Sequence, residues 1–201
     1  MIAYPERMSS TRTVQDVLAS AGQTLAFARM GQEDFAQGGT RRLLGLHTAV
    51  TQGRSVTFIL QGLRGRADGA DDWYTGVQQR LKDDPICRWF VEVRNRIEKQ
   101  GTAGQHFSAV TIHHLSGTQL RAMQPPGTIS TFFGDRLGRS GHVVRLADGS
   151  ETTIYFELPS HMGEATVYLA DAPENRPVEE LLERYLTILS EVVADAVTRF
   201  G

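Results

Sequence analysis

The chain has 201 residues, of which 40% are hydrophobic, and this length supports one sizeable core but is short for two independent ones. Its 21 Lys and Arg and 23 Asp and Glu residues give a formal net charge of −2, which excludes a long-range electrostatic attraction to nucleic acid or to an anionic membrane. The single cysteine, Cys87, excludes an internal disulfide and a cysteine-based zinc cluster. We therefore expect a single domain over residues 1–201.

The N-terminal sequence gives no sign of export. Residues 1–7 lack the basic start and apolar run of a secretory leader. No apolar stretch approaches the roughly 18 residues that a membrane span needs. We therefore expect a soluble, cytoplasmic protein with no membrane partner.

Three helices are predicted before residue 84. Thr13 and Asp16 form a capping-box pattern that opens the first helix, which ends near Gly31. A long second helical pattern runs from about Gly39 to Leu63, although Gly45 and Gly53 argue against an unbroken helix. Its expected inward positions are Leu43, Leu46, Val50, Phe58 and Leu60. After a loop over 62–69, Asp71 and Asp72 cap a short third helix whose buried side holds Trp73, Val77 and Leu81.

The fourth helix has the clearest start and stop. Asp84 is a favourable N-cap, Pro85 fits the first helical turn, and Gly101 ends the helix. One stripe collects the apolar positions Ile86, Phe90, Val93 and Ile97. Arg94 lies just off that stripe, with Glu98 one turn further on. This spacing predicts an i,i+4 ion pair along the rim of the helix.

From about His106 the hydrophobic period changes from 3.6 to 2. Strands are predicted over 108–115, 128–133, 142–146, 152–158 and 165–169, because these β-branched and aromatic runs are bounded by glycine or proline. Asp148-Gly149 predicts a hairpin between the third and fourth strands. In the fourth strand Ile154, Phe156 and Leu158 share one face, which predicts an antiparallel sheet with one solvent-facing side.

The last predicted helix starts at Asn175-Arg-Pro177 and carries a continuous apolar stripe. At 1.5 Å per residue it is roughly 35 Å long, too long to bury its stripe against a small sheet alone. We therefore expect an α+β fold in which a helical bundle (13–101) is completed by the C-terminal helix (176–200). The antiparallel β-sheet (106–170) is then an insertion between the fourth helix and this long C-terminal helix.

The Arg94-Asn95 pair near the end of a bundle helix resembles the HEPN superfamily (higher eukaryotes and prokaryotes nucleotide-binding). This resemblance implies an all-helical core, a homodimer that brings two motifs together, and metal-independent RNA cleavage or nucleotide binding. In this chain Lys99, Gln100 and Gly101 fill the places where the histidine of the family motif stands. The resemblance thus implies a noncatalytic binding module, with Arg94, Asn95, Glu98 and Lys99 as candidate ligand-binding residues and the catalytic residues unknown.

The missing histidine matters because cleavage through the RNA 2′-hydroxyl needs a group with a pKa near neutrality. An unperturbed lysine is charged at pH 7, so Lys99 is better suited to anchor a phosphate than to act as a base. The structural alternative is that Arg94 and Glu98 form a partly buried ion pair that only stabilises the helix.

Other side chains that suggest chemistry have structural interpretations. The aromatic pairs Trp73-Tyr74 and Trp89-Phe90 are typical of a core, and Cys87 of a small buried hydrophobe. His113 and His114 are consecutive on a strand and point to opposite faces, so they cannot bind one metal ion. We expect neither a metal nor a cofactor.

Several functions remain open. One is a noncatalytic HEPN-like module that binds RNA, a nucleotide or a protein in a stress or defence setting. Another is a scaffold or interaction protein that acts through its long C-terminal helix and exposed sheet face. A third is a metal-independent ribonuclease, and a fourth is an enzyme with a small-molecule pocket between bundle and sheet.

Overall fold

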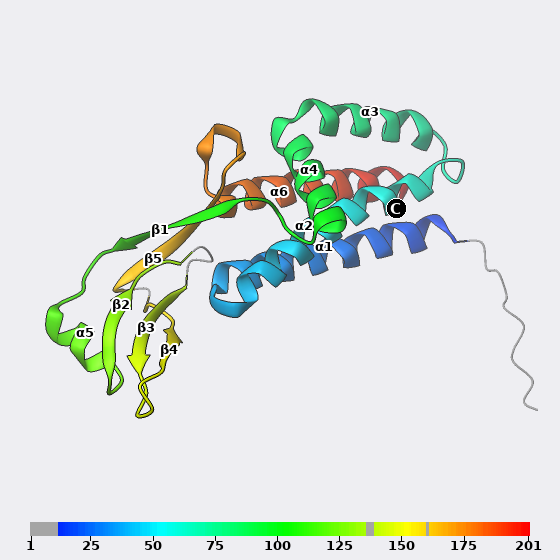
Figure 1. Ribbon diagram of the computed structural model, residues 1–201. Helices are drawn as coiled ribbons and strands as arrows, with labels where there is room; N and C mark the ends of the chain where they lie inside the picture. Colours follow the sequence, from blue (N-terminus) through cyan, green and yellow to red (C-terminus); the bar gives the residue numbers. More distant parts are fainter. Residues whose placement is uncertain (1–11, 136–138, 160) are drawn as a thin grey trace, which may run out of the picture.

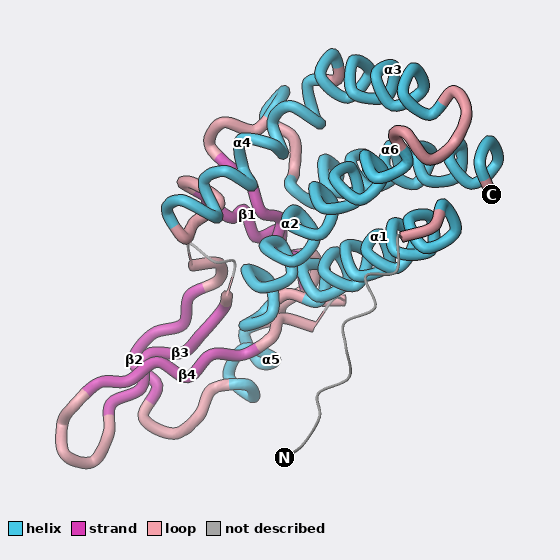
Figure 2. Tube along the Cα trace, turned by 90° about the vertical axis from the view of Figure 1, so that its right-hand side faces the viewer, coloured by secondary structure: helices cyan, strands magenta, loops and turns pink. Residues whose placement is uncertain are grey.

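The computed structural model describes residues 12–135, 139–159 and 161–201, and its fold is α+β as predicted. Helices form a bundle, and the strands project from one end of it (Figure 1). In a view rotated by 90° about the vertical axis, the strands β2, β3 and β4 extend away from the helices (Figure 2). Residues 1–7, on which the expected absence of a leader depends, lie outside the described residues.

Helix α1 (Val14–Gln37) begins at the predicted capping box. The Asp16 N–H donates to Thr13 Oγ1 at 3.1 Å, and the Thr13 N–H donates to the Asp16 carboxylate at 2.8 Å. The helix ends at Gln37 and not near Gly31, which corrects the predicted boundary. Gly31 is a contact point with the next helix, since a Cβ added there would lie 2.8 Å from Gly45 O.

Helix α2 (Arg42–Leu60) is unbroken and lies between two 3₁₀ turns, Gly39–Arg41 and Gln61–Leu63. Its glycines therefore do not interrupt the helix; Gly45 lets α2 approach α1. Two of the five predicted inward positions are wrong, because Leu43 is 38% and Phe58 is 50% exposed. The Arg54 guanidinium covers the Phe58 ring at 4.4 Å from its centroid, which explains how this aromatic side chain is accommodated at the surface.

Helices α3 (Ala70–Asp83) and α4 (Pro85–Gln100) meet at Asp84. The Asp84 carboxylate accepts from the Cys87 N–H at 2.9 Å, and Gly101 ends α4 in the left-handed conformation, as predicted. Gly69 is the N-cap of α3, so Asp71 and Asp72 lie in its first turn and not at the cap. Negative charge in that turn still favours the helix through its dipole.

Helix α6 (Val178–Phe200) follows a short 3₁₀ turn, Pro173–Asn175, and returns along the bundle beside α1 (Figure 1). Its stripe is buried as predicted. Seven residues of this helix belong to the main core, namely Val178, Leu181, Leu182, Tyr185, Leu186, Ile188 and Leu189. The scaffold hypothesis therefore loses the apolar face of this helix as a contact surface.

The strands form two small antiparallel sheets. Strand β1 (His106–Ile112) pairs with β5 (Gly163–Leu169). Strand β3 (Ser140–Arg145) lies between β2 (Thr128–Phe132) and β4 (Glu151–Phe156), with the predicted Asp148-Gly149 turn joining β3 to β4. A short helix, α5 (Gly117–Met123), was not predicted, although Ser116 and Gln119 form its capping box.

The predicted inward face of β4 is found only in part, because Phe156 and Leu158 are half-buried but Ile154 is exposed. Ile154 is 43% exposed and Tyr155, on the opposite face, is 48% exposed. Strand β4 is an edge strand of a sheet that extends away from the bundle (Figure 2), and only its last residues lie near helical residues. Burial in this sheet is concentrated on β3, where Val144 is 4% and His142 is 1% exposed, and the His142 ring stacks on Phe156 with the ring centroids 4.5 Å apart.

Candidate functional site

The four predicted ligand-binding residues lie at the C-terminal half of α4. Arg94 Nη2 forms the predicted ion pair with Glu98 Oε1 at 2.7 Å, and Arg94 Nη1 donates to Asn95 Oδ1 at 3.3 Å. The Arg94 side chain is 27% exposed, whereas Lys99 is exposed. The ion pair is therefore confirmed, and Arg94 is neutralised within its own helix. A ligand-binding role for Arg94, Asn95, Glu98 and Lys99 stays a prediction.

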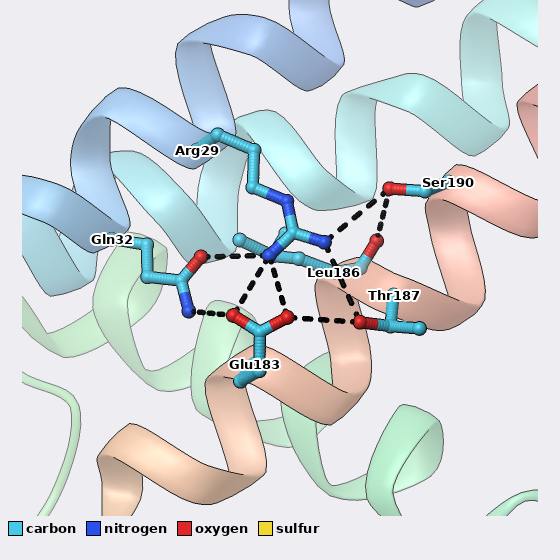
Figure 3. Close-up of polar contacts among 6 residues, drawn as sticks. All are labelled: Arg29, Gln32, Glu183, Leu186, Thr187 and Ser190. Atoms are coloured by element: carbon cyan, nitrogen blue, oxygen red, sulfur yellow. Dashed lines mark hydrogen bonds and ion pairs between the residues drawn. The ribbon is translucent and has the colours of Figure 1, made fainter.

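A polar cluster joins α1 to α6 (Figure 3). Arg29 Nη1 lies 2.9 Å from Glu183 Oε2, and Gln32 Nε2 donates to the same carboxylate oxygen at 2.7 Å. Thr187 Oγ1 donates to the other oxygen at 3.0 Å. These contacts connect side chains of both helices, so the cluster fastens α1 to α6.

Glu183→Gln should lower the free energy of unfolding by about 0.5–1 kcal/mol at neutral pH, because the carboxylate is partly exposed and its ion pair is screened. Hydrogen bonds from Gln32 and Arg29 lower the pKa of Glu183 from its ordinary 4.5. Its contribution is thus present above pH 4.5 and is lost as the pH falls through the lowered pKa. Urea unfolding at several pH values measures the free energy of unfolding of wild type and of Glu183→Gln. The difference between the two free energies should shrink as the pH falls below 4.5.

The control for this variant is Glu191→Gln on the same helix, since Glu191 is exposed and makes no ion pair among the described residues. It should leave stability unchanged at every pH. An equal loss in both variants would contradict a specific role for the cluster.

A groove lies between the helices on another side of the bundle. Its volume is about 570 Å³, and α2, α3, α4 and α6 each contribute to its walls. Its floor is apolar and aromatic, formed by Tyr74, Val77, Leu81, Trp89, Tyr185 and Leu189. A cavity of this size and character is typical of a binding site.

One residue that lines this groove, Trp89, carries an unmatched polar atom. The Trp89 side chain is 7% exposed, and its indole Nε1–H is buried with no hydrogen-bond partner among the described residues. Buried donors of this kind are nearly always paired in folded proteins. The indole therefore marks a position where an acceptor from outside the chain would be stabilising.

The rim of the groove carries an excess of positive charge. Arg54, Lys82 and Arg88 line it together with a single carboxylate, Glu92. Lys82 and Arg88 are exposed and make no ion pair within residues 12–135, 139–159 and 161–201. The groove can therefore hold an apolar group and, beside it, a negative charge.

Cys87 also lines the groove but is not suited to nucleophilic chemistry. It is 3% exposed, and burial, together with the nearby Asp84 carboxylate, raises the pKa of its thiol to about 12. The thiolate fraction at neutral pH is then negligible. Burial likewise raises the pKa of Tyr185.

Sequence reasoning correctly assigned Trp89 to the core and overlooked Arg54, Lys82 and Arg88. No local signal could have found these three as a group, because they lie on three successive helices and come together only when α2, α3 and α4 pack with α6. Within the described ranges, no cluster of histidine, cysteine and acidic residues is arranged to hold a metal ion. None of the helices described combines the length and apolar character needed to cross a membrane.

Comparisons with known proteins find a similarity to a phage protein over part of the chain. The family model described as bacteriophage lambda protein ea47 matches residues 41–128, which run from the start of α2 to the start of β2. Protein ea47 of Escherichia phage lambda is 41% identical over 59 residues, which are 29% of this chain and only 14% of that protein. No solved structure matches the chain.

These comparisons overturn the HEPN resemblance, since the matching family is that of ea47 and no HEPN family matches. The resemblance depended on the dipeptide Arg94-Asn95, and the structure shows this arginine held by Glu98, with α4 ending at Gly101. The groove residues from Arg54 to Glu92 all fall inside the matched segment. The chain is thus similar to phage lambda ea47 over the part that forms α2, α3, α4, β1 and α5.

Proposed function

We propose that this protein is a noncatalytic binding module that takes an acidic, amphipathic helix of a partner protein in the groove between α2, α3, α4 and α6. The observation that carries the proposal is the buried, unpaired Trp89 indole N–H at the floor of an apolar groove with a cationic rim. A partner helix would supply both the apolar surface and the missing acceptor.

Apolar side chains would supply most of the affinity. A helix presents anchors at positions i, i+3, i+4 and i+7 along one face, and such a face fits a groove whose floor is formed by parallel rows of aromatic and aliphatic side chains. Tyr74 of α3 and Trp89 of α4 are aromatic members of this lining. Large buried aromatic side chains are also the residues that dominate binding energy at protein interfaces.

The charge of the rim selects the partner. Arg54, Lys82 and Arg88 outnumber Glu92, so acidic residues flanking the apolar anchors would be attracted and basic residues repelled. A glutamate or aspartate side chain of the partner could also accept from the Trp89 indole.

A nucleotide or RNA is the less favourable occupant. Phosphate groups bind well at helix N-termini with free backbone N–H groups. At the groove, the N-terminus of α4 is already capped by the Asp84 carboxylate, whose negative charge opposes a phosphate. The lining is also mainly apolar and aromatic, which favours apolar side chains over the polar edges of bases.

Fluorescence anisotropy with a labelled synthetic peptide tests the proposal. The peptide is a helix former with leucine and phenylalanine at i, i+3, i+4 and i+7 and glutamate at the outer positions. We expect a Kd of roughly 1–100 μM, at least tenfold weaker binding of the matched lysine peptide, and quenching or shift of the tryptophan emission.

Lys82→Glu and Arg88→Glu should each weaken binding of the acidic peptide by about tenfold. The matched control is Lys99→Glu, which makes the same charge change on α4 outside the groove and tests the predicted site at the same time. An effect of Lys99→Glu without one of Lys82→Glu would place the ligand at the Arg94 end of α4 instead. Tighter binding of a single-stranded RNA oligonucleotide than of the peptide would replace the protein partner by RNA.

A further inference from the structure

A second pocket lies where the strands join the bundle, and we call it the junction pocket. Its volume is about 680 Å³. It is bounded by the C-terminal end of α1, the first residue of α2, the start of β3, the end of β4, the first half of β5, and the first turn of α6. Figure 1 shows β5 running from the projecting strands to the start of α6, so the pocket is at the corner between the two parts of the fold.

Two charged side chains at the back of this pocket are incompletely paired. Arg42 is 9% exposed, and its Nη1 donates to Ala165 O at 3.1 Å. Its Nε is buried without a partner among the described residues, and so is Oε2 of Glu179. The guanidinium and this carboxylate form no ion pair with each other in the structure described. Buried charges left in this state are destabilising unless further groups complete their hydrogen bonds.

Burial acts against the charge on both groups. It lowers the pKa of Arg42 and raises the pKa of Glu179, while the charge of each partly offsets the effect on the other. The carboxylate of Glu164 raises the pKa of Glu179 further. A positive group entering beside Glu179 would relieve this repulsion.

Uncompensated acidic residues extend from Glu179 toward solvent. Glu157 and Glu164 line the same pocket, are exposed, and make no ion pair within the described ranges. The other charged residues of the pocket are already matched, since Arg139 pairs with Asp135 at 2.6 Å and Glu180 with Arg176 at 3.0 Å. Three carboxylates therefore face one guanidinium, and the field inside favours a cation.

The placement of these carboxylates suits an organic cation better than a metal ion. A divalent metal needs several oxygen ligands converging on one point, and no cluster of this kind is present in residues 12–135, 139–159 and 161–201. The carboxylates are instead spread over three segments, the residue after β4, strand β5 and helix α6, at the walls of a volume that suits a small organic molecule.

We propose that the junction pocket binds a basic amino-acid group. The guanidinium or ammonium of the ligand lies against Glu157, Glu164 and Glu179, and a carboxylate or carbonyl oxygen of the same ligand accepts from Arg42. A free basic amino acid and a basic residue at the end of a peptide share this chemistry. The site is separate from the helical groove and does not depend on its function.

Isothermal titration calorimetry of the full chain with four probes tests this assignment. The probes are L-arginine, the dipeptide Gly-Arg, agmatine, which has the guanidinium but no carboxylate, and L-glutamate. We expect whichever of L-arginine and Gly-Arg binds more tightly to have a Kd of about 0.1–1 mM. Agmatine should bind at least about fivefold more weakly than that probe. L-glutamate should give no heat of binding. Tighter binding of L-arginine identifies the free amino acid as the ligand, and tighter binding of Gly-Arg identifies the peptide terminus.

The variants Glu157→Gln and Glu164→Gln change only exposed side chains. Each should lower the affinity for the tighter-binding probe by about three- to tenfold. Glu179→Gln should have the largest effect. The control Glu191→Gln on α6 and the groove variant Lys82→Glu should both bind as wild type does. Absence of heat with L-arginine and Gly-Arg at about 10 mM, or wild-type affinity in all three pocket variants, would overturn the proposal while leaving the groove untouched.

Discussion

Replacement of Gly45 by alanine should lower the free energy of unfolding by about 3 kcal/mol, because the added methyl group has no space between α1 and α2. A Cβ at this position would meet the backbone of α1, lying 2.6 Å from Gly31 O and 2.8 Å from Asp34 C. The obstructing atoms belong to a helix backbone, which cannot rotate away as a flexible side chain can. The two helices must therefore move apart, and the contacts along the whole pair weaken.

The matched control is Gly22→Ala in α1, where a Cβ would have no heavy atom within 4 Å. Alanine is the better helix former, so this change should raise stability by roughly 0.5–1 kcal/mol. Urea unfolding followed by far-UV circular dichroism measures both variants. Equal effects at the two positions would mean that helix propensity, and not the close approach of α1 and α2, governs the response to glycine replacement.

Local signals in the sequence were sufficient for the elements with clear ends. Asp84, Pro85 and Gly101 define α4 because capping acts within one turn of the chain. The stripe of α6 was found because its apolar residues follow the helical period without interruption. The strand positions followed in the same way from β-branched runs bounded by turns.

The errors arise where packing between distant segments decides the outcome. Helix α2 has apolar residues on more than one face, so periodicity alone cannot say that Leu46 faces inward while Leu43 and Phe58 face solvent. Glycine was interpreted as a helix breaker, whereas Gly31 and Gly45 bring two helices together. Likewise, alternation in β4 predicts two different faces but not whether the bundle reaches either of them.

The candidate sites were less predictable than the fold. The Arg94–Glu98 ion pair was predicted correctly because its partners are four residues apart on one helix. The groove and the junction pocket, in contrast, each combine side chains from segments more than a hundred residues apart, such as Arg42 with Glu179. A dipeptide on a helix suggested a family that the comparisons do not support, because so short a pattern recurs by chance.

Phe90→Ala should lower the free energy of unfolding by about 4 kcal/mol, since it empties the contact between α4 and α6. Phe90 is 1% exposed; its ring stacks on Tyr185 at 4.6 Å and meets Trp89 edge-on at 4.7 Å. The same substitution at Phe107, which is 53% exposed, should cost less than about 1 kcal/mol and serves as the control.

The Phe90 variant also connects the core to the groove, because Tyr185 and Trp89 form part of the groove floor. Loss of the ring between them should let both side chains shift, so Phe90→Ala should bind the acidic peptide at least tenfold more weakly under conditions where it remains folded. Phe90→Leu keeps most of the apolar volume and should recover most of the stability. Thermal unfolding and peptide anisotropy on the same samples separate the two effects. A folded Phe90→Ala variant with wild-type affinity would show that the peptide does not use the floor formed by Trp89 and Tyr185.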